Sequence, residues 1–539
     1  MTGGHPLLEV TDLRTRIKEA DVVDGVSLTV GRGETVGLVG ESGSGKTLTA
    51  LSVVGLLPRA ARVVGGRVAL DGQDLLALTD KRRRAMLAAD VGVIFQNPTV
   101  ALNPRLTVGA QLREALPAGL RRDRAGARRR VLELLDQVGI ARGAERLTAY
   151  PHEFSGGLNQ RIMIAIAIAR SPRLLVADEP TTALDVSVQA QVLDLLDTLR
   201  ADLGLGVLLV THDVGVVADR ADRVAVMHAG RIVEQATTAE VLERPAHERT
   251  RSLLANVPRL DDPAPPPVAA GGRPVLEVRG AVRQFRSGGG APIRAVGGVD
   301  LVLHPGQALG LVGESGSGKT TLARLVVGLD RPTEGTVLHD GDDPHTLDRA
   351  GRARWRRRVQ YVFQDPYGSL DPRLTVDRII GEPIELSGTP AERRARRERI
   401  EELLAEVDLP ASFAARQPDQ LSGGQRQRVA IARALALDPT LVVADEPVSA
   451  LDLSVQATIL ALLRRLRETR GLTYVVISHD LAVIKGLCTD VAVMQGGRIV
   501  ERGPTEEVLG RPEHPYTASL LAAVPGRRLA GPAVVPTSA

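Results

Sequence analysis

The octapeptide GESGSGKT occurs twice in this chain, at residues 40–47 and at residues 313–320. Each copy follows a short apolar run and fits the pattern GxxxxGK[ST], in which glycines turn the chain sharply between a strand and a helix. Such a loop points backbone N–H groups at phosphate oxygens, and its lysine adds a positive charge. One such string can arise by chance as a glycine turn before a helix. Two copies in register make that explanation negligible and predict two phosphate-binding loops.

The pattern assigns a role to each residue of the two loops. The lysines reach the β and γ phosphates, and Thr47 and Thr320 offer hydroxyl ligands to Mg²⁺. We therefore expect ATP and Mg²⁺ as ligands. The expected phosphate-binding residues are Gly40, Ser42, Gly43, Ser44, Gly45, Lys46 and Thr47 in the first copy, and Gly313, Ser315, Gly316, Ser317, Gly318, Lys319 and Thr320 in the second.

The whole chain is a tandem duplication. The later landmarks recur in the same order and at nearly constant spacing: Gln96 with Gln364, Ser155 with Ser422, Asp178 with Asp445, and His212 with His479. Between the copies lies a proline-rich segment that cannot form a helix and favours a semi-extended spacer. We expect a first domain over residues 6–260, this linker over 261–274, a second domain over 275–525, and a disordered tail over 526–539.

Each copy has the pattern of an α/β fold. Short apolar runs such as residues 35–39, 174–177 and 207–210 indicate buried strands, and segments such as residues 131–138 have helical periodicity. This alternation predicts a mainly parallel sheet in each copy.

Composition limits the classes of function. Hydrophobic residues make up 43% and charged residues 24% of the 539 positions, which is typical of a folded protein, and the net charge of +4 decides little because both signs are interspersed. Aromatic residues make up only 2%, which argues against a surface that stacks single-stranded nucleic acid.

The lone cysteine and the hydropathy pattern bear on location. Cys488 alone cannot form an internal disulfide, a zinc finger or an all-cysteine iron–sulfur site, so the chain suits a reducing compartment. The most apolar stretch, residues 162–169, is far shorter than the roughly 20 residues that cross a bilayer. We expect a cytosolic protein without a signal peptide, which is docked if it works at a membrane.

Adjacent carboxylates follow a buried strand in each copy, as Asp178-Glu179 and as Asp445-Glu446. In isolation such a pair is more often a capping or salt-bridge device. Downstream of a phosphate loop, however, one carboxylate can serve the Mg²⁺ shell while the other polarises water. We favour this catalytic interpretation, with Asp178 and Asp445 as metal ligands.

A third motif points to a known family. FSGGLNQR at residues 154–161 and LSGGQRQR at residues 421–428 resemble the signature motif of ABC ATPases. A serine and two glycines that open a helix present free N–H groups and the positive end of the helix dipole. The resemblance implies that each signature binds the γ-phosphate of a nucleotide held by the opposite copy. Its expected ligands are Ser155, Gly156, Gly157, Ser422, Gly423, Gly424 and Gln425.

The remaining ABC motifs are present in both copies. Gln96 and Gln364 resemble the Q-loop glutamine, residues 183–185 and 450–452 resemble the D-loop, and His212 and His479 resemble the switch histidine. The resemblance covers essentially the whole chain and implies two P-loop NTPase domains, each with a helical subdomain. It implies catalytic roles for Glu179, Glu446, His212, His479, Gln96 and Gln364, nucleotide contacts for Asp185 and Asp452, and Mg²⁺ ligation by Gln96 and Gln364 beside the threonines and aspartates.

The adenine contact differs between the copies. The family stacks an aromatic side chain on adenine, and alignment of the two LEV triplets places Ile17 opposite Phe285. Phe285 can stack on adenine or belong to the core, whereas Ile17 can only pack.

Two further segments resemble the importer branch for peptides, nickel and glutathione. They are QNPTVALNP and QDPYGSLDP, which start at Gln96 and Gln364, and C-terminal extensions at residues 244–258 and 511–525 that each begin RPxH. The resemblance implies an ATPase that powers import, with peptides as the expected solute. It also implies two transmembrane permease subunits, an extracytoplasmic substrate-binding protein, no nucleic acid, no direct contact with the solute, and a peripheral position on the cytoplasmic face of the inner membrane.

Rival functions predict other features. A soluble tandem ABC ATPase that acts on ribosomes or another macromolecular complex predicts a long, charged helical linker, unlike the short proline-rich one here. A repair-type ABC ATPase needs zinc cysteines, which one cysteine cannot supply. A purely regulatory nucleotide binder is disfavoured by the intact glutamates and histidines. One difference between the copies predicts unequal sites, since Leu158 stands in the first signature where the second has Gln425.

Overall fold

The computed structural model describes residues 5–182, 184–268, 271–285, 292–365, 367–449 and 451–526. The described residues form two compact units, one that ends at Val257 and also includes Pro525 and Gly526, and one from Pro258 to Val524. The expected D-loop segments are described only in part. Ala183 and Ala450 lie outside the described residues, whereas Asp185 and Asp452 lie within them. The tail expected at 526–539 lies outside them from residue 527 onwards.

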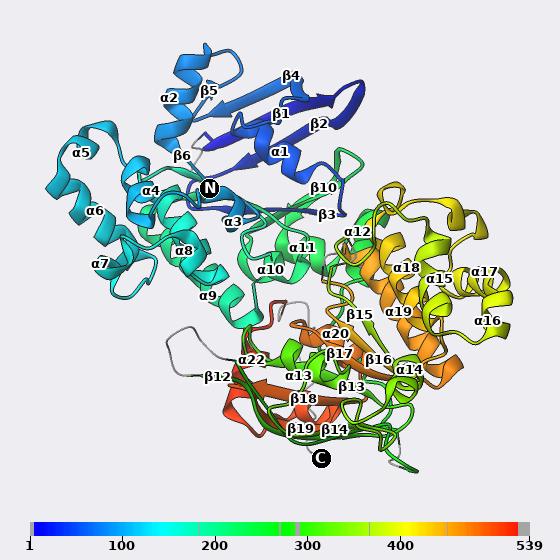
Figure 1. Cartoon of the computed structure of the whole chain (residues 1–539). Coiled ribbons are helices and arrows are strands. Elements are labelled where there is room, and N and C mark those ends of the chain that lie inside the picture. The colour runs from blue at the N-terminus through cyan, green and yellow to red at the C-terminus, as the bar shows by residue number, and fades with distance from the viewer. Residues whose placement is uncertain are drawn as a thin grey trace, which may run out of the picture. The chain divides into compact units, whose positions relative to one another are not determined.

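The first unit is built on two sheets (Figure 1). Its larger sheet has the strand order β10-β9-β3-β8-β7-β6, and all neighbours are parallel except β10 and β9. The smaller sheet is antiparallel, in the order β2-β1-β4-β5. The strands are β1 (Leu8–Ile17), β2 (Ala20–Val30), β3 (Thr35–Gly40), β4 (Ala61–Leu70), β5 (Gln73–Asp74), β6 (Val91–Ile94), β7 (Leu174–Asp178), β8 (Gly206–Val210), β9 (Arg223–His228) and β10 (Arg231–Thr237).

Helices cover the larger sheet and form a separate lobe in which α8 packs against α4, α6 and β6 (Figure 1). This lobe is the expected helical subdomain. The helices are α1 (Lys46–Val53), α2 (Asp80–Asp90), α3 (Pro98–Ala101), α4 (Val108–Ala115), α5 (Ala118–Arg122), α6 (Arg124–Gln137), α7 (Gly143–Arg146), α8 (Gly156–Ile168), α9 (Val186–Leu203), α10 (Val214–Arg220), α11 (Thr238–Glu243) and α12 (Glu248–Ala255), with a 3₁₀ turn η1 (Pro151–Glu153).

The second unit repeats this plan. Its larger sheet has the order β15-β16-β17-β13-β18-β19, again parallel except at the last pair, and its smaller sheet has the order β12-β11-β14. The strands are β11 (Leu276–Phe285), β12 (Ile293–Leu303), β13 (Ala308–Val312), β14 (Glu334–His339), β15 (Val359–Val362), β16 (Leu441–Asp445), β17 (Thr473–Ile477), β18 (Asp490–Gln495) and β19 (Arg498–Pro504).

The helical lobe of the second unit is formed by α15 to α18, which pack on one another. The helices are α13 (Lys319–Val326), α14 (Arg349–Arg358), α15 (Val376–Ser387), α16 (Pro390–Arg394), α17 (Arg396–Glu406), α18 (Gly423–Leu435), α19 (Leu453–Arg470), α20 (Leu481–Leu487), α21 (Thr505–Gly510) and α22 (Pro515–Ala523), with 3₁₀ turns η2 (Ala411–Ala415) and η3 (Pro418–Gln420).

The apolar runs form the central strands because both faces of the larger sheets are covered. All residues of β7, β8, β16 and β17 are buried. A parallel strand covered on both faces is a continuous hydrophobic run and does not alternate. The sheet therefore places the residue that follows each of these strands at its carboxyl edge, where the site is built.

The antiparallel sheets are not predicted by the sequence analysis. In β1 the pairing with β2 shifts register between Val10 and Leu13, between Leu13 and Arg14, and between Thr15 and Arg16. Each bulge moves the following side chains to the other face, so a simple alternation of apolar and polar residues is lost.

Candidate functional site

Both phosphate-binding loops have the geometry that their glycines predict. Gly40 has a φ of 155°, and a Cβ there would lie 2.2 Å from the carbonyl oxygen of Met227. Gly313 has a φ of 146° and a Cβ there would lie equally close to the oxygen of Met494. Only glycine fits at either position. The close approach joins each loop to the neighbouring β9 or β18 and fixes the start of α1 or α13.

The loop lysines are buried and point into the loops. Lys46 is 6% exposed, and its Nζ donates to the carbonyl oxygens of Gly40 and Glu41, both at 2.8 Å. Lys319 makes the same contacts with Gly313 and Glu314, at 2.7 and 2.8 Å. A buried ammonium needs such acceptors. Both lysines therefore lie inside the concave face of the loop, where a phosphate would lie.

The two glutamates occupy strained backbone positions. Glu179 follows β7 with a φ of 48°, and Glu446 follows β16 with a φ of 47°. A non-glycine residue in this region is uncommon and costs on the order of 1–3 kcal/mol. The strain turns each glutamate away from the direction of its strand, into the edge where the glutamine and histidine lie.

The first glutamate is held from three sides. Gln96 Nε2 donates to its Oε2 at 2.7 Å, Thr182 Oγ1 donates to the same oxygen at 2.9 Å, and His212 Nδ1 lies 3.0 Å from Oε1. Burial works to raise the pKa of Glu179, but the hydrogen bonds with His212 and Thr182 and the nearby positive charges together outweigh it, and the pKa is lowered. That same bond raises the pKa of His212. The carboxylate is thus kept ionised and oriented.

The second glutamate has the equivalent glutamine and histidine as partners. Gln364 Nε2 donates to Glu446 Oε2 at 2.7 Å, and His479 Nδ1 lies 3.2 Å from Oε1. Burial opposes ionisation here too, and the hydrogen bond with His479 lowers the pKa of Glu446. The structure therefore brings together the glutamine, glutamate and histidine that sequence analysis selected in each copy.

The two aspartates present oxygen ligands beside the loops. Asp178 is 6% exposed, and Thr47 Oγ1 donates to its Oδ1 at 3.2 Å. Burial, and then the neighbouring Glu179, raise the pKa of Asp178 to about 6. Burial also raises the pKa of Asp445. A buried carboxylate next to a threonine hydroxyl offers the hard oxygen donors that Mg²⁺ prefers, so these residues fit that ion.

The signature serines lie at helix starts that are open to solvent. Ser155 is the N-cap of α8, and its Oγ accepts from Leu158 N at 3.4 Å. Ser422 is the N-cap of α18, and its Oγ accepts from Gln425 N at 3.3 Å. Both serines are exposed. Among the described residues, no hydrogen bond joins either serine to the phosphate loop of its own unit.

Gln425 has a local partner that explains its difference from Leu158. Its Oε1 accepts from the backbone N–H of Ser422 at 3.0 Å and completes a reciprocal capping box. Leu158 cannot accept this bond, so α8 lacks half of that cap. The amide that the first signature lacks therefore serves, in this structure, to hold the start of the signature helix.

This difference predicts an effect on local stability. Leu158→Gln should slow hydrogen exchange at the start of α8 by about 2- to 10-fold, because one regained hydrogen bond is worth about 0.5–1.5 kcal/mol. Exchange monitored by mass spectrometry over residues 150–160 measures this. The matched variant Gln425→Leu should speed exchange at the start of α18 by a similar factor. No change in either variant would contradict the role of this cap.

The D-loop aspartates are also helix caps. Asp185 Oδ1 accepts from Val188 N at 3.0 Å and caps α9, and Asp452 Oδ1 accepts from Val455 N at 3.1 Å and caps α19. Their side chains are thus used within their own units, and the nucleotide contact expected from the resemblance stays a prediction.

The two expected adenine positions are equivalent in the structure. Ile17 ends β1 and Phe285 ends β11. Phe285 is 40% exposed, and the Arg283 guanidinium lies 4.8 Å from the centre of its ring. The exposed ring is available for stacking, which a residue of the core is not. Ile17 is half-buried.

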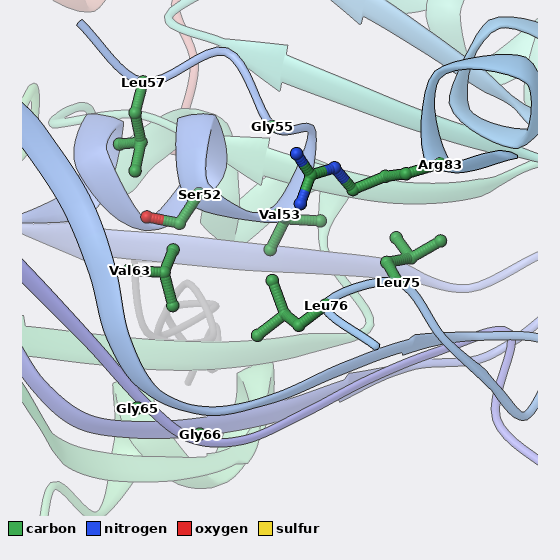
Figure 2. Close-up of a pocket in the computed structure, with 10 residues that line it drawn as sticks. All are labelled: Ser52, Val53, Gly55, Leu57, Val63, Gly65, Gly66, Leu75, Leu76 and Arg83. Atoms are coloured by element: carbon green, nitrogen blue, oxygen red, sulfur yellow. The ribbon is translucent and has the colours of Figure 1, made fainter. Parts of the chain in front are cut away.

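A cavity of about 450 Å³ in the first unit lies away from these motifs (Figure 2). It is lined by Ser52 and Val53 of α1, by Gly55, by Leu75 and Leu76, and by Arg83 of α2. In the second unit the ring of Trp355 lies against Gly328, where the first unit has Leu87 beside Gly55. The cavity contains none of the predicted site residues.

The chain belongs to the ABC transporter family, which its sequence matches over residues 23–182 and 296–449. It also matches the oligopeptide/dipeptide transporter C-terminal region over residues 233–279 and 500–530. The chain is therefore an ABC-type ATPase with two tandem α/β nucleotide-binding domains, and the resemblance and fold class inferred from the sequence are confirmed.

Relatives of known function resemble the chain over nearly its full length. The oligopeptide transport ATP-binding protein OppD of Mycobacterium bovis is 43% identical and the alignment covers 96% of this chain and 98% of that protein. The peptidoglycan transport ATP-binding protein YejF of Agrobacterium fabrum is 45% identical, with 97% of each chain covered. Among solved structures, the archaeal ribosome recycling factor aABCE1, in complex with the ribosomal stalk protein aP1, covers 94% of this chain with a TM-score of 0.64. It is only 22% identical, so it shows the shared fold alone.

Two residues at the site are not predicted by sequence analysis. Thr182 donates to Glu179, and the Tyr361 hydroxyl donates to Asp445 Oδ2 at 2.6 Å. Thr182 follows Glu179 by three residues and could have been found from that spacing. Tyr361 lies on a neighbouring strand, and only the sheet brings it to the aspartate.

Proposed function

We propose that this chain hydrolyses ATP at two sites to drive import of peptides through separate permease subunits. The observation that carries the proposal is that both glutamates that follow the buried aspartates are present, ionised and hydrogen-bonded to a glutamine and a histidine. The relatives are ATP-binding components of oligopeptide and peptidoglycan transport. The ribosomal alternative has only the shared fold in its support.

Each residue has a distinct task in this reaction. The loop N–H groups and the lysine bind the β and γ phosphates and neutralise the charge that develops during transfer. The glutamate orients and deprotonates the attacking water, and the histidine holds the glutamate and contacts the γ-phosphate. Mg²⁺, when bound, would supply positive charge that neutralises the triphosphate. In the first unit the ion would be held by Thr47, Asp178 and Gln96. In the second unit it would be held by Thr320, Asp445 and Gln364.

The relatives, which are ATP-binding components of transport systems, support a proposal about the partners and the location. No helix among the described residues is long and apolar enough to cross a membrane. We propose two permease subunits, an extracytoplasmic binding protein that delivers the solute, and a peripheral position on the cytoplasmic face of the membrane. The loops after Gln96 and Gln364 are the proposed contacts with the permeases.

Loss of transport in living cells tests this function. Cells that lack this chain should fail to grow on a peptide as the sole source of a required amino acid. The intact chain should restore growth, whereas a chain with both Glu179→Gln and Glu446→Gln should not. Growth on the free amino acid is the control. Full peptide uptake without the chain would contradict the proposal.

We further propose that each site is completed by the signature of the other unit, as the family resemblance implies, because both signature serines are exposed and no described hydrogen bond joins them to the phosphate loop of their own unit. Ser42→Cys combined with Gly423→Cys should form a disulfide only when ATP is bound. Both positions have room for a cysteine side chain, since Ser42 is exposed and a Cβ at Gly423 would meet only Leu451, at 3.4 Å. The only native cysteine, Cys488, is buried and does not interfere.

The matched control joins the same loop to the signature of its own unit. Ser42→Cys with Gly156→Cys should not form a disulfide with or without ATP, and a Cβ at Gly156 is equally tolerated. Crosslinking of this control pair, or equal crosslinking of the first pair without nucleotide, would contradict the composite site. The disulfide is detected as a shift in mobility on a non-reducing gel.

A further inference from the structure

The buried aspartates Asp178 and Asp445 have different hydrogen-bond partners in the two units. In the second unit, the Tyr361 hydroxyl donates to Asp445 Oδ2 at 2.6 Å. In the first unit, the described contact of the Asp178 carboxylate is with Thr47, on Oδ1. Both aspartates end a central strand and are buried. The difference therefore comes from the neighbouring strand.

The sheet places one residue of that strand beside each aspartate. Tyr361 of β15 pairs with Val443 of β16, two residues before Asp445. Since side chains two residues apart lie on the same face of a strand, Tyr361 and Asp445 share a face. Val93 of β6 pairs with Val176 of β7 in the same register, two residues before Asp178. The first unit thus has an apolar side chain where the second has a hydroxyl.

Tyr361 is fixed in its position by packing. Its ring makes an edge contact with Phe363, with centres 4.7 Å apart and planes at 64°. The short bond holds the Oδ2 oxygen of the Asp445 carboxylate at the Tyr361 hydroxyl. The orientation of Asp445 is therefore determined before any ligand binds.

We infer that Tyr361 is a positioning residue that orients Asp445 for the metal that accompanies the nucleotide, and that the second unit binds this metal more tightly than the first because Val93 cannot do the same. This inference rests on the proposed binding of Mg²⁺ with ATP. Partners of this kind, which hold a ligating carboxylate, change metal affinity by 10- to 100-fold when they are removed.

The test separates metal binding from nucleotide binding. The experiment uses the full chain with Lys46→Ala, so that a fluorescent ATP analogue binds at the second site. Binding of the analogue is measured at increasing Mg²⁺ concentrations and, separately, its affinity is measured in EDTA without Mg²⁺. Tyr361→Phe keeps the ring and its contact with Phe363 but lacks the hydroxyl. We expect it to raise the half-saturating Mg²⁺ concentration by about 10-fold, while affinity in EDTA stays unchanged.

The converse variant tests the inference at the first site. In a chain with Lys319→Ala, Val93→Tyr should lower the half-saturating Mg²⁺ concentration of the first site, because Phe95 stands there as Phe363 does in the second unit. An unchanged Mg²⁺ requirement in Tyr361→Phe, or an equal loss of affinity in EDTA, would overturn the inference. If the chain without changes at Tyr361 showed no dependence on Mg²⁺, the proposed metal would itself be wrong.

Discussion

Replacement of Lys46 or Lys319 by alanine should reduce ATP turnover by on the order of 100-fold or more, because each lysine supplies the fixed positive charge that meets the triphosphate in the transition state. Both ammonium groups are buried and already held inside their loops by two carbonyl oxygens. Alanine removes the charge and leaves these oxygens, which repel phosphate. Transport should fail together with turnover. Phosphate release by the chain in complex with its permeases measures the effect.

A matched lysine controls for a loss of charge in general. Lys81 lies exposed on α2, far from the loops in the sequence, and Lys81→Ala should retain normal turnover. Wild-type turnover in either loop variant would contradict the assignment of these loops as the phosphate sites. A loss in Lys81→Ala as large as in the loop variants would show that the assay reports folding and not catalysis.

Glu179→Gln and Glu446→Gln should each reduce turnover strongly, and Glu179→Gln should reduce it more. Glutamine keeps the size of the side chain but can neither accept a proton from water nor balance the histidine charge. The inequality follows from the proposed composite sites, in which the Lys46 site faces Ser422 and the Lys319 site faces Ser155. The helix behind Ser422 has the complete cap made by Gln425. The helix behind Ser155 has Leu158 instead.

The expected difference between the two glutamate variants is a few-fold to about tenfold, since one or two hydrogen bonds are worth about 0.5–1.5 kcal/mol each. Ile17 works against this difference, because it leaves the Lys46 site without an aromatic side chain to stack on adenine. The missing contact weakens ATP binding there by about 1 kcal/mol. That loss acts on binding and disappears at saturating ATP. Glu19→Gln and Glu468→Gln, both exposed, are the controls. Equal losses, or the reverse order, would show that the signature does not set the inequality.

Much of the fold and site is predictable because it depends on local sequence. The glycine loops are needed wherever the chain turns from a buried strand into a helix, and the apolar runs form central strands because both their faces are covered. The aspartate and glutamate pairs are found from their place after such strands. The sequence also predicts that Gln96 and His212 act with Glu179, and the structure places them within hydrogen-bond distance of it.

What the sequence does not reveal depends on contacts between strands. The antiparallel sheets are missed because bulges in β1 and β11 break the alternation of side chains. Tyr361 is missed because it lies 84 residues before Asp445 in the chain. Only the parallel pairing of β15 with β16 brings the two side chains together. The local partner of Gln425 is missed because the sequence comparison treats that amide as a ligand of nucleotide and not as a cap.

Uptake and hydrolysis measured together in one preparation test the central claim most directly. The chain is reconstituted with its permease subunits in proteoliposomes that contain ATP on the side of the chain, and labelled peptide uptake is followed alongside phosphate release. We expect uptake to require ATP and to stop, with phosphate release, in the chain that combines Glu179→Gln and Glu446→Gln. Uptake that proceeds without ATP, or that continues in the double variant, would contradict the account.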